Sequence, residues 1–265
     1  INTGEAGLPE WFDSLRRTFP DWDVFITPQL NDMEYRRERA WQDMIADLNI
    51  CEREKLHLAT SIRSFRTPDL AAFVKAILDM DIEQAKTLYQ CIKDKYPVRL
   101  TRDLNTAKRW VREQCQGTTR YGMLASSGAL RLKPEGIFVK NEISVANWFL
   151  NGKDDVRSSY YLEDVVSEFD IQGLELDYSI VAWDADFRFD GTKWTYYNFV
   201  GNRWQNVSTE ERRLYLKNAY RVLLTRARQG MVLFIPRGSD TDASRKRAWY
   251  DALFQYLCGI GIEVI

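Results

Sequence analysis

The sequence predicts an α/β protein in which a mostly parallel sheet is flanked by helices and carries a β-hairpin insertion. Short apolar runs that are typical of buried strands alternate along the chain with longer segments whose apolar residues recur at helical spacing. Asp190-Gly191 separates two aromatic-rich runs and is a strong hairpin signal. No internal repeat or low-complexity linker interrupts the chain, so we expect a single domain over residues 1–265, with the insertion at 184–207.

Residues 1–50 are expected to form a helical N-terminal segment. Pro9 stands in the first turn of a helix that ends near Phe19, and Trp11 lies on its apolar face. A second, charged helix is expected over residues 32–48.

The rest of the chain alternates between expected strands and helices. Pro68 suits the first turn of a helix, and Asp103 suits an N-cap. The further helices are expected over residues 67–78, 81–96, 103–115, 143–150, 209–226 and 243–257. The strands are expected at 56–62, 98–100, 121–125, 165–169, 179–183, 231–235 and 262–265, with hairpin strands at 187–189 and 194–198.

Composition excludes several classes of site. The four cysteines are widely spaced without a C-x-x-C pair, and His57 is the only histidine, so zinc-site spacing is absent and we expect no metal site. Isolated cysteines fit a reducing cytoplasm, and no apolar run approaches the roughly 18 residues that span a membrane. We therefore expect a cytoplasmic protein without a membrane partner. The first residue is Ile1 rather than Met, which suggests a piece of a longer protein.

The charge is unevenly distributed along the chain. The net charge is −1, yet the segment 208–228 contains six basic and two acidic residues, a local charge of +4. A local basic surface can bind phosphates within a neutral protein. The alternative is a solvated helix face, and charge alone leaves both interpretations open.

Three motifs place polar and charged residues beside expected strands. They are Leu58-Ala-Thr-Ser-Ile-Arg-Ser-Phe-Arg66, Gln172-Gly-Leu-Glu175 and Leu224-Thr-Arg-Ala227. The planar fork of arginine suits phosphate oxygens, and an arginine can stabilise the charge on a phosphoryl group during its transfer. The phosphate-binding loop G-x-x-x-x-G-K-[ST] is absent from the chain.

In this order, the motifs resemble those of the second RecA-like domain of superfamily 1 helicases. More narrowly, the chain resembles the Schlafen-type helicase-domain family of P-loop NTPases, over nearly its whole length. The segments that carry the narrower resemblance are Asn2-Thr-Gly-Glu5, Ile62-Arg-Ser-Phe-Arg66, Ala125-Ser-Ser-Gly128, Gln172-Gly-Leu-Glu175 and Leu224-Thr-Arg-Ala227. One departure is that Glu168 or Phe169, depending on the alignment, replaces the small or hydroxyl residue that usually opens the motif containing Gln172-Gly-Leu-Glu175.

The resemblance implies a C-terminal motor domain of an ATP-dependent DNA or RNA helicase or translocase. Arg63 and Arg226 would be its catalytic arginine fingers. The implied nucleotide-binding residues are Gln172, Gly173, Glu175, Tyr220 and Thr225, and the nucleic-acid contacts are Ser126, Ser127 and Arg66. An upstream RecA-like domain would supply the Walker motifs, and single-stranded DNA or RNA would be the other partner. ATP and Mg²⁺ would be bound by the full-length protein, whereas this chain alone is expected to bind neither and to be inactive.

Two other functions fit parts of the sequence. One is a non-catalytic NTPase-like regulatory or scaffold module. The other is a metal-dependent nuclease that uses Asp184, Asp186 and Glu168, although acids beside a hairpin are more often solvated. The hairpin aromatics Trp194, Tyr196 and Tyr197 could stack on bases or cover a sheet edge.

Overall fold

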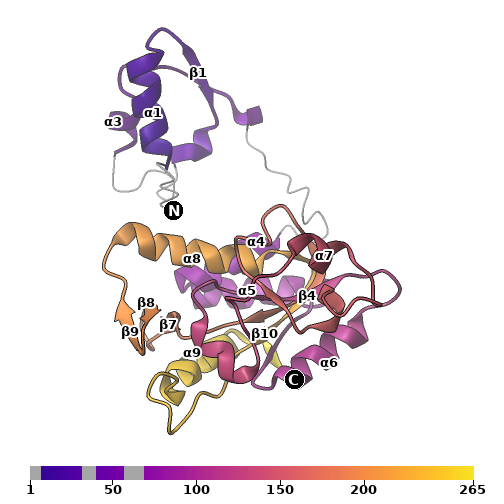
Figure 1. Cartoon of the computed structure of the whole chain (residues 1–265). Coiled ribbons are helices and arrows are strands. Elements are labelled where there is room, and N and C mark those ends of the chain that lie inside the picture. The colour runs from indigo at the N-terminus through magenta and orange to yellow at the C-terminus, as the bar shows by residue number, and fades with distance from the viewer. Residues whose placement is uncertain (1–6, 32–39, 57–68) are drawn as a thin grey trace. The chain divides into compact units, whose positions relative to one another are not determined.

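The computed structural model of the chain describes residues 7–31, 40–56 and 69–265 (Figure 1). The chain divides into two compact units, Ile1–Ser61 and Ile62–Ile265. None of the helices in the described residues combines the length and the apolar character needed to cross a membrane.

The first unit pairs two short strands in parallel beside its helices. Its elements are α1 (Gly7–Thr18), β1 (Asp23–Ile26), η1 (Pro28–Asn31), α3 (Trp41–Ile45), β2 (Asn49–Glu52) and η2 (Glu54–Leu56). The rings of Phe12 and Trp41 meet edge to face, with centroids 6.0 Å apart, in a small core with Met44. The two strands correct the expectation that residues 1–50 are helical. Most of their residues are exposed or half-buried, so neither strand has the clear apolar pattern of a buried strand.

The second unit contains the predicted alternation of helices and strands. It begins with α4 (Asp69–Asp79), α5 (Ile82–Ile92), β3 (Val98–Thr101), α6 (Leu104–Gln114), β4 (Tyr121–Ala125), η3 (Leu130–Glu135), α7 (Val145–Leu150), η4 (Ser159–Tyr161) and β5 (Val165–Val166). It continues with β6 (Leu176–Ala182), β7 (Phe187–Phe189), β8 (Trp194–Val200), β9 (Arg203–Asn206), α8 (Glu210–Leu224), β10 (Ala227–Phe234), α9 (Arg247–Ile260) and β11 (Glu263–Val264). The strand expected at 56–62 lies outside the described residues, except for Leu56 at the end of η2.

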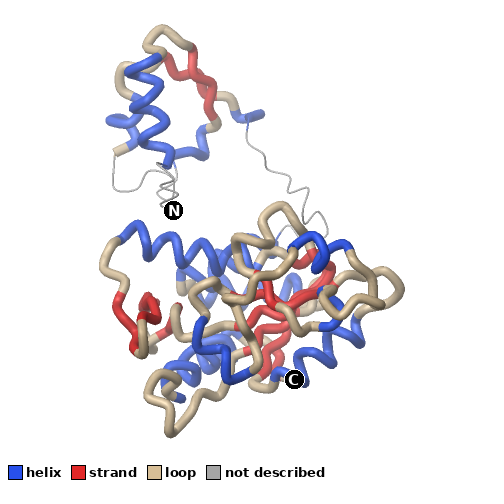
Figure 2. The backbone as a smooth tube through the Cα atoms, viewed as in Figure 1, coloured by secondary structure: helices blue, strands red, loops and turns tan. Residues whose placement is uncertain are grey.

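Within residues 69–265, six strands form an all-parallel sheet in the order β11-β3-β10-β6-β4-β5. Figure 2 shows strands at the centre of this unit with helices and loops around them. Alternate residues of β10 supply two cores, one on each face of this sheet: Met231 and Leu233 in one, Val232 and Phe234 in the other. The first core contains apolar residues of α4, α5, α8 and α9, and the second contains residues of α6 and η3. The α/β prediction is therefore confirmed.

A second sheet consists of the antiparallel strands β7, β8 and β9. The predicted turn at Asp190 and Gly191 joins β7 to β8, and Oδ1 of Asp190 accepts hydrogen bonds from the amides of Thr192 and Lys193, both 2.9 Å long. The hairpin prediction is confirmed, and β9 adds a strand that the sequence did not indicate.

Alanine in place of Gly122 should destabilise the second unit, because a Cβ on this residue of β4 would lie 2.5 Å from Cζ2 of Trp148 in α7. Overpacking of this kind costs about 1–3 kcal/mol. Gly259 in α9 is the matched control, since a Cβ there meets no atom within 4 Å and alanine favours a helix by up to about 1 kcal/mol. Chemical denaturation should move the two variants in opposite directions; a Gly122→Ala variant as stable as the wild type would contradict the packing of β4 on α7.

Candidate functional site

Two of the sequence motifs meet at the amino ends of β6 and β10. The amide of Leu176 donates to the carbonyl oxygen of Arg226 over 3.0 Å, and Leu176 stands in register with Ala227. Arg226 is 8% exposed, and Glu175 is partly buried. The structure thus brings together two predicted site residues, Glu175 and Arg226, at one edge of the parallel sheet.

The residues that flank this pair are held by local geometry. Gly173 has a φ of +82°, in the left-handed region that favours glycine, and it is exposed together with Gln172. Oγ1 of Thr225 donates to the carbonyl oxygen of Arg221 over 2.8 Å, which closes the last turn of α8. Thr225 therefore caps the C-terminus of α8, and the chain leaves the helix at Arg226.

A β-bulge in β10 lies at the same edge, next to Arg226. Between Ala227 and Gly230, β10 has one residue more than the facing segment of β6. The two residues inside the bulge, Arg228 and Gln229, both donate to Oδ1 of Asp177, over 2.7 and 2.9 Å. A single carboxylate of β6 therefore holds both of them.

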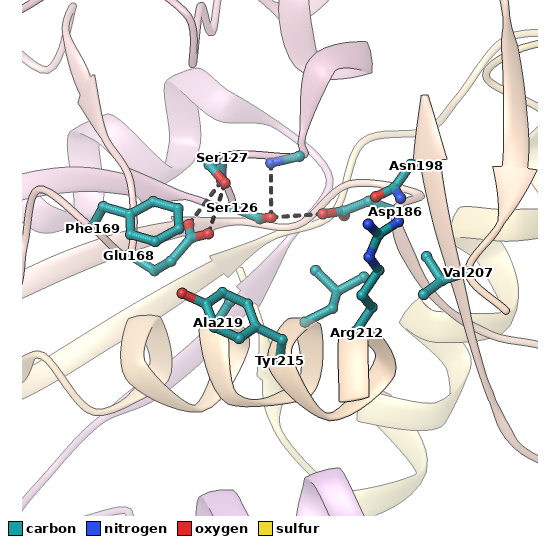
Figure 3. A pocket seen from close by; sticks show the side chains of 12 residues that line it. Ser126, Ser127, Glu168, Phe169, Asp186, Asn198, Val207, Arg212, Tyr215 and Ala219 are labelled. Carbon is teal, nitrogen blue, oxygen red and sulfur yellow. Dashed lines mark hydrogen bonds between the residues drawn. The ribbon is translucent and has the colours of Figure 1, made fainter. Parts of the chain in front are cut away.

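A pocket of about 280 Å³ lies at the opposite edge, where the carboxyl ends of β4, β5 and β6 meet (Figure 3). Its walls include Ser127, Glu168, Phe169, Asn198, Arg212 and Tyr215. In Figure 3, Phe169, Tyr215 and Glu168 stand on one side, and the Arg212 and Asn198 side chains stand on the other. Ligands of parallel sheets bind at this kind of edge.

The loop after β4 is anchored by two carboxylates. The amide and the hydroxyl of Ser127 both donate to Glu168, over 2.8 and 2.7 Å. The Ser126 hydroxyl is buried and donates to Oδ2 of Asp186 over 2.7 Å. Gly128 permits this close approach, because a Cβ there would lie 3.0 Å from the same Oδ2. Of the two serines predicted to contact nucleic acid, Ser127 is partly accessible on the pocket wall, whereas the hydroxyl of Ser126 is directed inward.

Asp184 and Asp186 are 1% and 0% exposed, which corrects the expectation that they are solvated. Oδ1 of Asp186 accepts hydrogen bonds from the Tyr220 hydroxyl over 2.6 Å and from the Phe187 amide over 3.0 Å. Asp184 accepts one from the Tyr250 hydroxyl over 2.8 Å. Burial raises the pKa of Asp186 to about 7, and the neighbouring charge of Asp184 adds to the rise. Burial also raises the pKa of Asp184.

Tyr220 belongs to this buried network. Its hydroxyl reaches Asp186 beyond the carboxyl end of β6, and its ring packs on Trp183 with centroids 4.5 Å apart. The resemblance implied that Tyr220 serves the nucleotide site. Its side chain is directed away from the edge at which Glu175 and Arg226 lie.

The three acids of the nuclease alternative are held by protein donors. Glu168, Asp184 and Asp186 each accept at least two hydrogen bonds from nearby amides or hydroxyls. In the part of the chain that the structure describes, no cluster of three or more His, Cys, Asp or Glu side chains is placed to hold a metal ion.

Residues 27–237 match the family model of the Schlafen group 3, DNA/RNA helicase domain. The chain belongs to this Schlafen helicase-domain family. A comparison with curated proteins gave no match. The match supports a helicase-like module, in agreement with the narrower resemblance of its motifs.

Some residues that carried the resemblance lie outside the described parts of this Schlafen helicase domain. They are the Asn2–Glu5 segment and the motif that contains Arg63 and Arg66. Their predicted roles therefore stay predictions, as do those of Gln172, Gly173 and Thr225.

The aromatic residues of the insertion pack internally in this helicase domain. Trp194 is buried and stacks on Phe187, with centroids 4.3 Å apart. The guanidinium carbon of Arg188 lies 3.9 Å from the ring centroid of Tyr197 and 3.7 Å from that of Trp249. The insertion is therefore anchored to α9 through a buried arginine.

The pocket rings are features that sequence reasoning missed. In the sequence, Phe169 stands out only as a departure from the family motif, and an aromatic residue at a position that is usually small or polar indicates an altered contact there. Tyr215 lies on the helix predicted over 209–226, and only the fold brings its ring to within 6.4 Å of Phe169.

We expect the stability of the domain to depend on the titration of Asp186. Its pKa is raised above the value of about 3.9 in an unfolded chain. Its protonated form therefore adds stability that is fully present below about pH 4 and is lost as the pH rises through about 7.

The Asp186→Asn variant is the matched control, because its amide can donate to Ser126 and its oxygen can accept from Tyr220 as the protonated acid would. Denaturation between about pH 5 and 8 should show the wild type losing stability relative to the variant as the pH rises, by up to about 1.4 kcal/mol per pH unit. A difference that stays constant, or that grows in favour of the wild type, would show that Asp186 is ionised in the fold.

Proposed function

We propose that the chain is the C-terminal motor domain of an ATP-dependent DNA or RNA helicase or translocase. The observation that carries this proposal is the meeting of Glu175 and Arg226 at the amino ends of β6 and β10. Both residues occupy the positions that the superfamily 1 resemblance assigns to the nucleotide site, and membership of the helicase-domain family supports that assignment.

The chemistry required of this domain is the stabilisation of negative charge. The guanidinium of Arg226 would contact the phosphoryl group as charge develops on it during transfer, an interaction worth about 10³- to 10⁵-fold in rate in comparable enzymes. Glu175 would hold the ribose. Arg63 would add a second arginine, as the resemblance implies. Closure of the cleft between the two domains would exclude water around Arg226 and strengthen its interaction with the nucleotide.

The remaining parts of the ATP site would come from an upstream RecA-like domain. The sequence contains no G-x-x-x-x-G-K-[ST] loop, and in this proposal the upstream domain would bind the phosphates and supply the Mg²⁺ ligands. Mg²⁺ would neutralise phosphate charge there. The residues of this chain fit a completing role, because a buried arginine and a carboxylate, rather than a glycine-rich phosphate loop, occupy the motif edge.

Helix α8 offers a physical link between this edge and the pocket. Arg212 and Tyr215 lie in the pocket wall, Tyr220 is bonded to Asp186, and the helix ends just before Arg226. A movement of the pocket wall would therefore be transmitted along one rigid element to the arginine. Such a link is what a nucleic-acid-stimulated ATPase needs.

Arg226→Ala should reduce ATP turnover by at least about 10³-fold in a protein that comprises this chain and its upstream Walker domain. The measurement is steady-state ATPase rate with and without single-stranded DNA or RNA. Arg226→Lys should also be slow, since a lysine keeps the charge but not the planar fork. The 265-residue chain alone should not hydrolyse ATP.

Arg109→Ala is the control for this experiment. Arg109 is exposed on α6 and bonds Thr106 of the same helix over 3.1 Å, so its loss removes an arginine without changing the bulge or the proposed finger. Its turnover should stay within a few-fold of the wild type. An unchanged rate in Arg226→Ala would remove the arginine-finger assignment, and normal ATP affinity without turnover in the unmodified protein would favour a regulatory module.

A further inference from the structure

Two exposed aromatic rings stand at the pocket on the carboxyl edge of the sheet. Phe169 is 49% exposed and Tyr215 is 41% exposed, and their ring centroids are 6.4 Å apart with an interplanar angle of 33°. They come from different elements, the loop after β5 and the helix α8. Proteins that hold single-stranded nucleic acid stack its bases on aromatic rings presented in this way.

The polar group beside the rings is a carboxylate. Each oxygen of Glu168 accepts one hydrogen bond from Ser127, over 2.7 and 2.8 Å. Glu168 is 6% exposed and lines the pocket, and a carboxylate oxygen has two lone-pair directions, so each oxygen can accept a second hydrogen bond besides the one from Ser127. Acidic side chains pair with the exocyclic amino group of cytosine, whereas the oxygen at the same position of thymine or uracil would be repelled.

Arg212 gives the pocket a cation on the side away from the rings (Figure 3). It is exposed on the first turn of α8 and extends toward Asn198 of β8. A guanidinium binds phosphate through charge-assisted hydrogen bonds. The pocket therefore presents an aromatic platform, an acceptor for amino groups and a phosphate-binding cation within about 280 Å³, which is small for a cofactor and suits a single base.

We propose that this pocket binds one base of a single strand of DNA or RNA and prefers bases that carry an exocyclic amino group. The base stacks on Phe169 and Tyr215, its amino group donates to Glu168, and its phosphate lies on Arg212. This inference rests on the proposed nucleic-acid function. It adds a preference for certain bases at one position of a single-strand binding site that is otherwise independent of sequence.

The experiment measures the binding of labelled oligo(dC) and oligo(dT), each of about ten nucleotides, to the 265-residue chain by fluorescence anisotropy. Oligo(dC) should bind about fivefold or more tightly than oligo(dT). Phe169→Ala should weaken the binding of oligo(dC) by about tenfold, and Arg212→Ala should weaken both oligonucleotides to a similar extent.

Glu168→Gln tests the selectivity itself. The glutamine oxygen can accept from the Ser127 amide, and its NH2 can donate one hydrogen to the Ser127 hydroxyl, which reverses that hydrogen bond, and the other to the base. The preference for oligo(dC) should therefore disappear or reverse although binding persists. This readout is insensitive to a modest loss of stability, because it is a ratio measured on the same protein sample.

Matched controls come from outside the pocket. Tyr161→Ala removes another exposed ring, and Arg109→Ala removes another exposed arginine. Both should bind like the wild type, and circular dichroism should confirm that every variant is folded.

Equal binding of the two oligonucleotides, with Phe169→Ala unaffected, would overturn the base pocket and leave the motor proposal intact. A chain that binds neither oligonucleotide would also overturn the pocket. The motor proposal is decided separately, by stimulation of ATP turnover in the two-domain protein, so the two failures are distinguishable.

Discussion

The carboxylate of Asp186 is the point on which the carboxyl edge of the sheet depends. It joins the loop after β4, the start of β7 and the middle of α8, through the Ser126 hydroxyl, the Phe187 amide and the Tyr220 hydroxyl. An isolated carboxylate at such depth would be strongly unfavourable. Its hydrogen-bond donors and a raised pKa reduce that cost, and together they position the elements around the pocket.

The parallel sheet could be predicted because its strands are buried on both faces and appear in the sequence as apolar runs. The strand that the sequence predicts at 121–125 has the same bounds as β4 in the structure. The strand predicted at 231–235 begins earlier in the structure, at Ala227, because Arg228 and Gln229 are polar residues held in a bulge by Asp177. Hydropathy does not carry information about such a contact.

The site was predictable only in part, and the reason is distance along the chain. The resemblance to superfamily 1 helicases assigns Glu175 and Arg226 to one site, and each precedes an apolar run, but the pairing of their two strands is seen only in the structure. The donors of the buried acids could not be found in this way. Tyr220 is 34 residues from Asp186, and Tyr250 is 66 residues from Asp184. The sequence therefore favours solvent exposure for Asp184 and Asp186, whereas the fold buries both of them almost completely.

The bulge in β10 has a consequence for how insertions and deletions can act on this domain. Side chains of a strand alternate between two faces, so one extra residue inverts the alternation on one side of it. Met231 to Phe234 must keep the alternation that fills the two cores. The segment that ends in Arg226 lies on the other side of the bulge, and its residues Leu223 and Leu224 are buried in the first core as well. Loss of a single bulge residue during evolution would therefore displace apolar side chains on one side of the bulge from the interior, so packing on both sides fixes the length of the bulge and, with it, the position of the arginine.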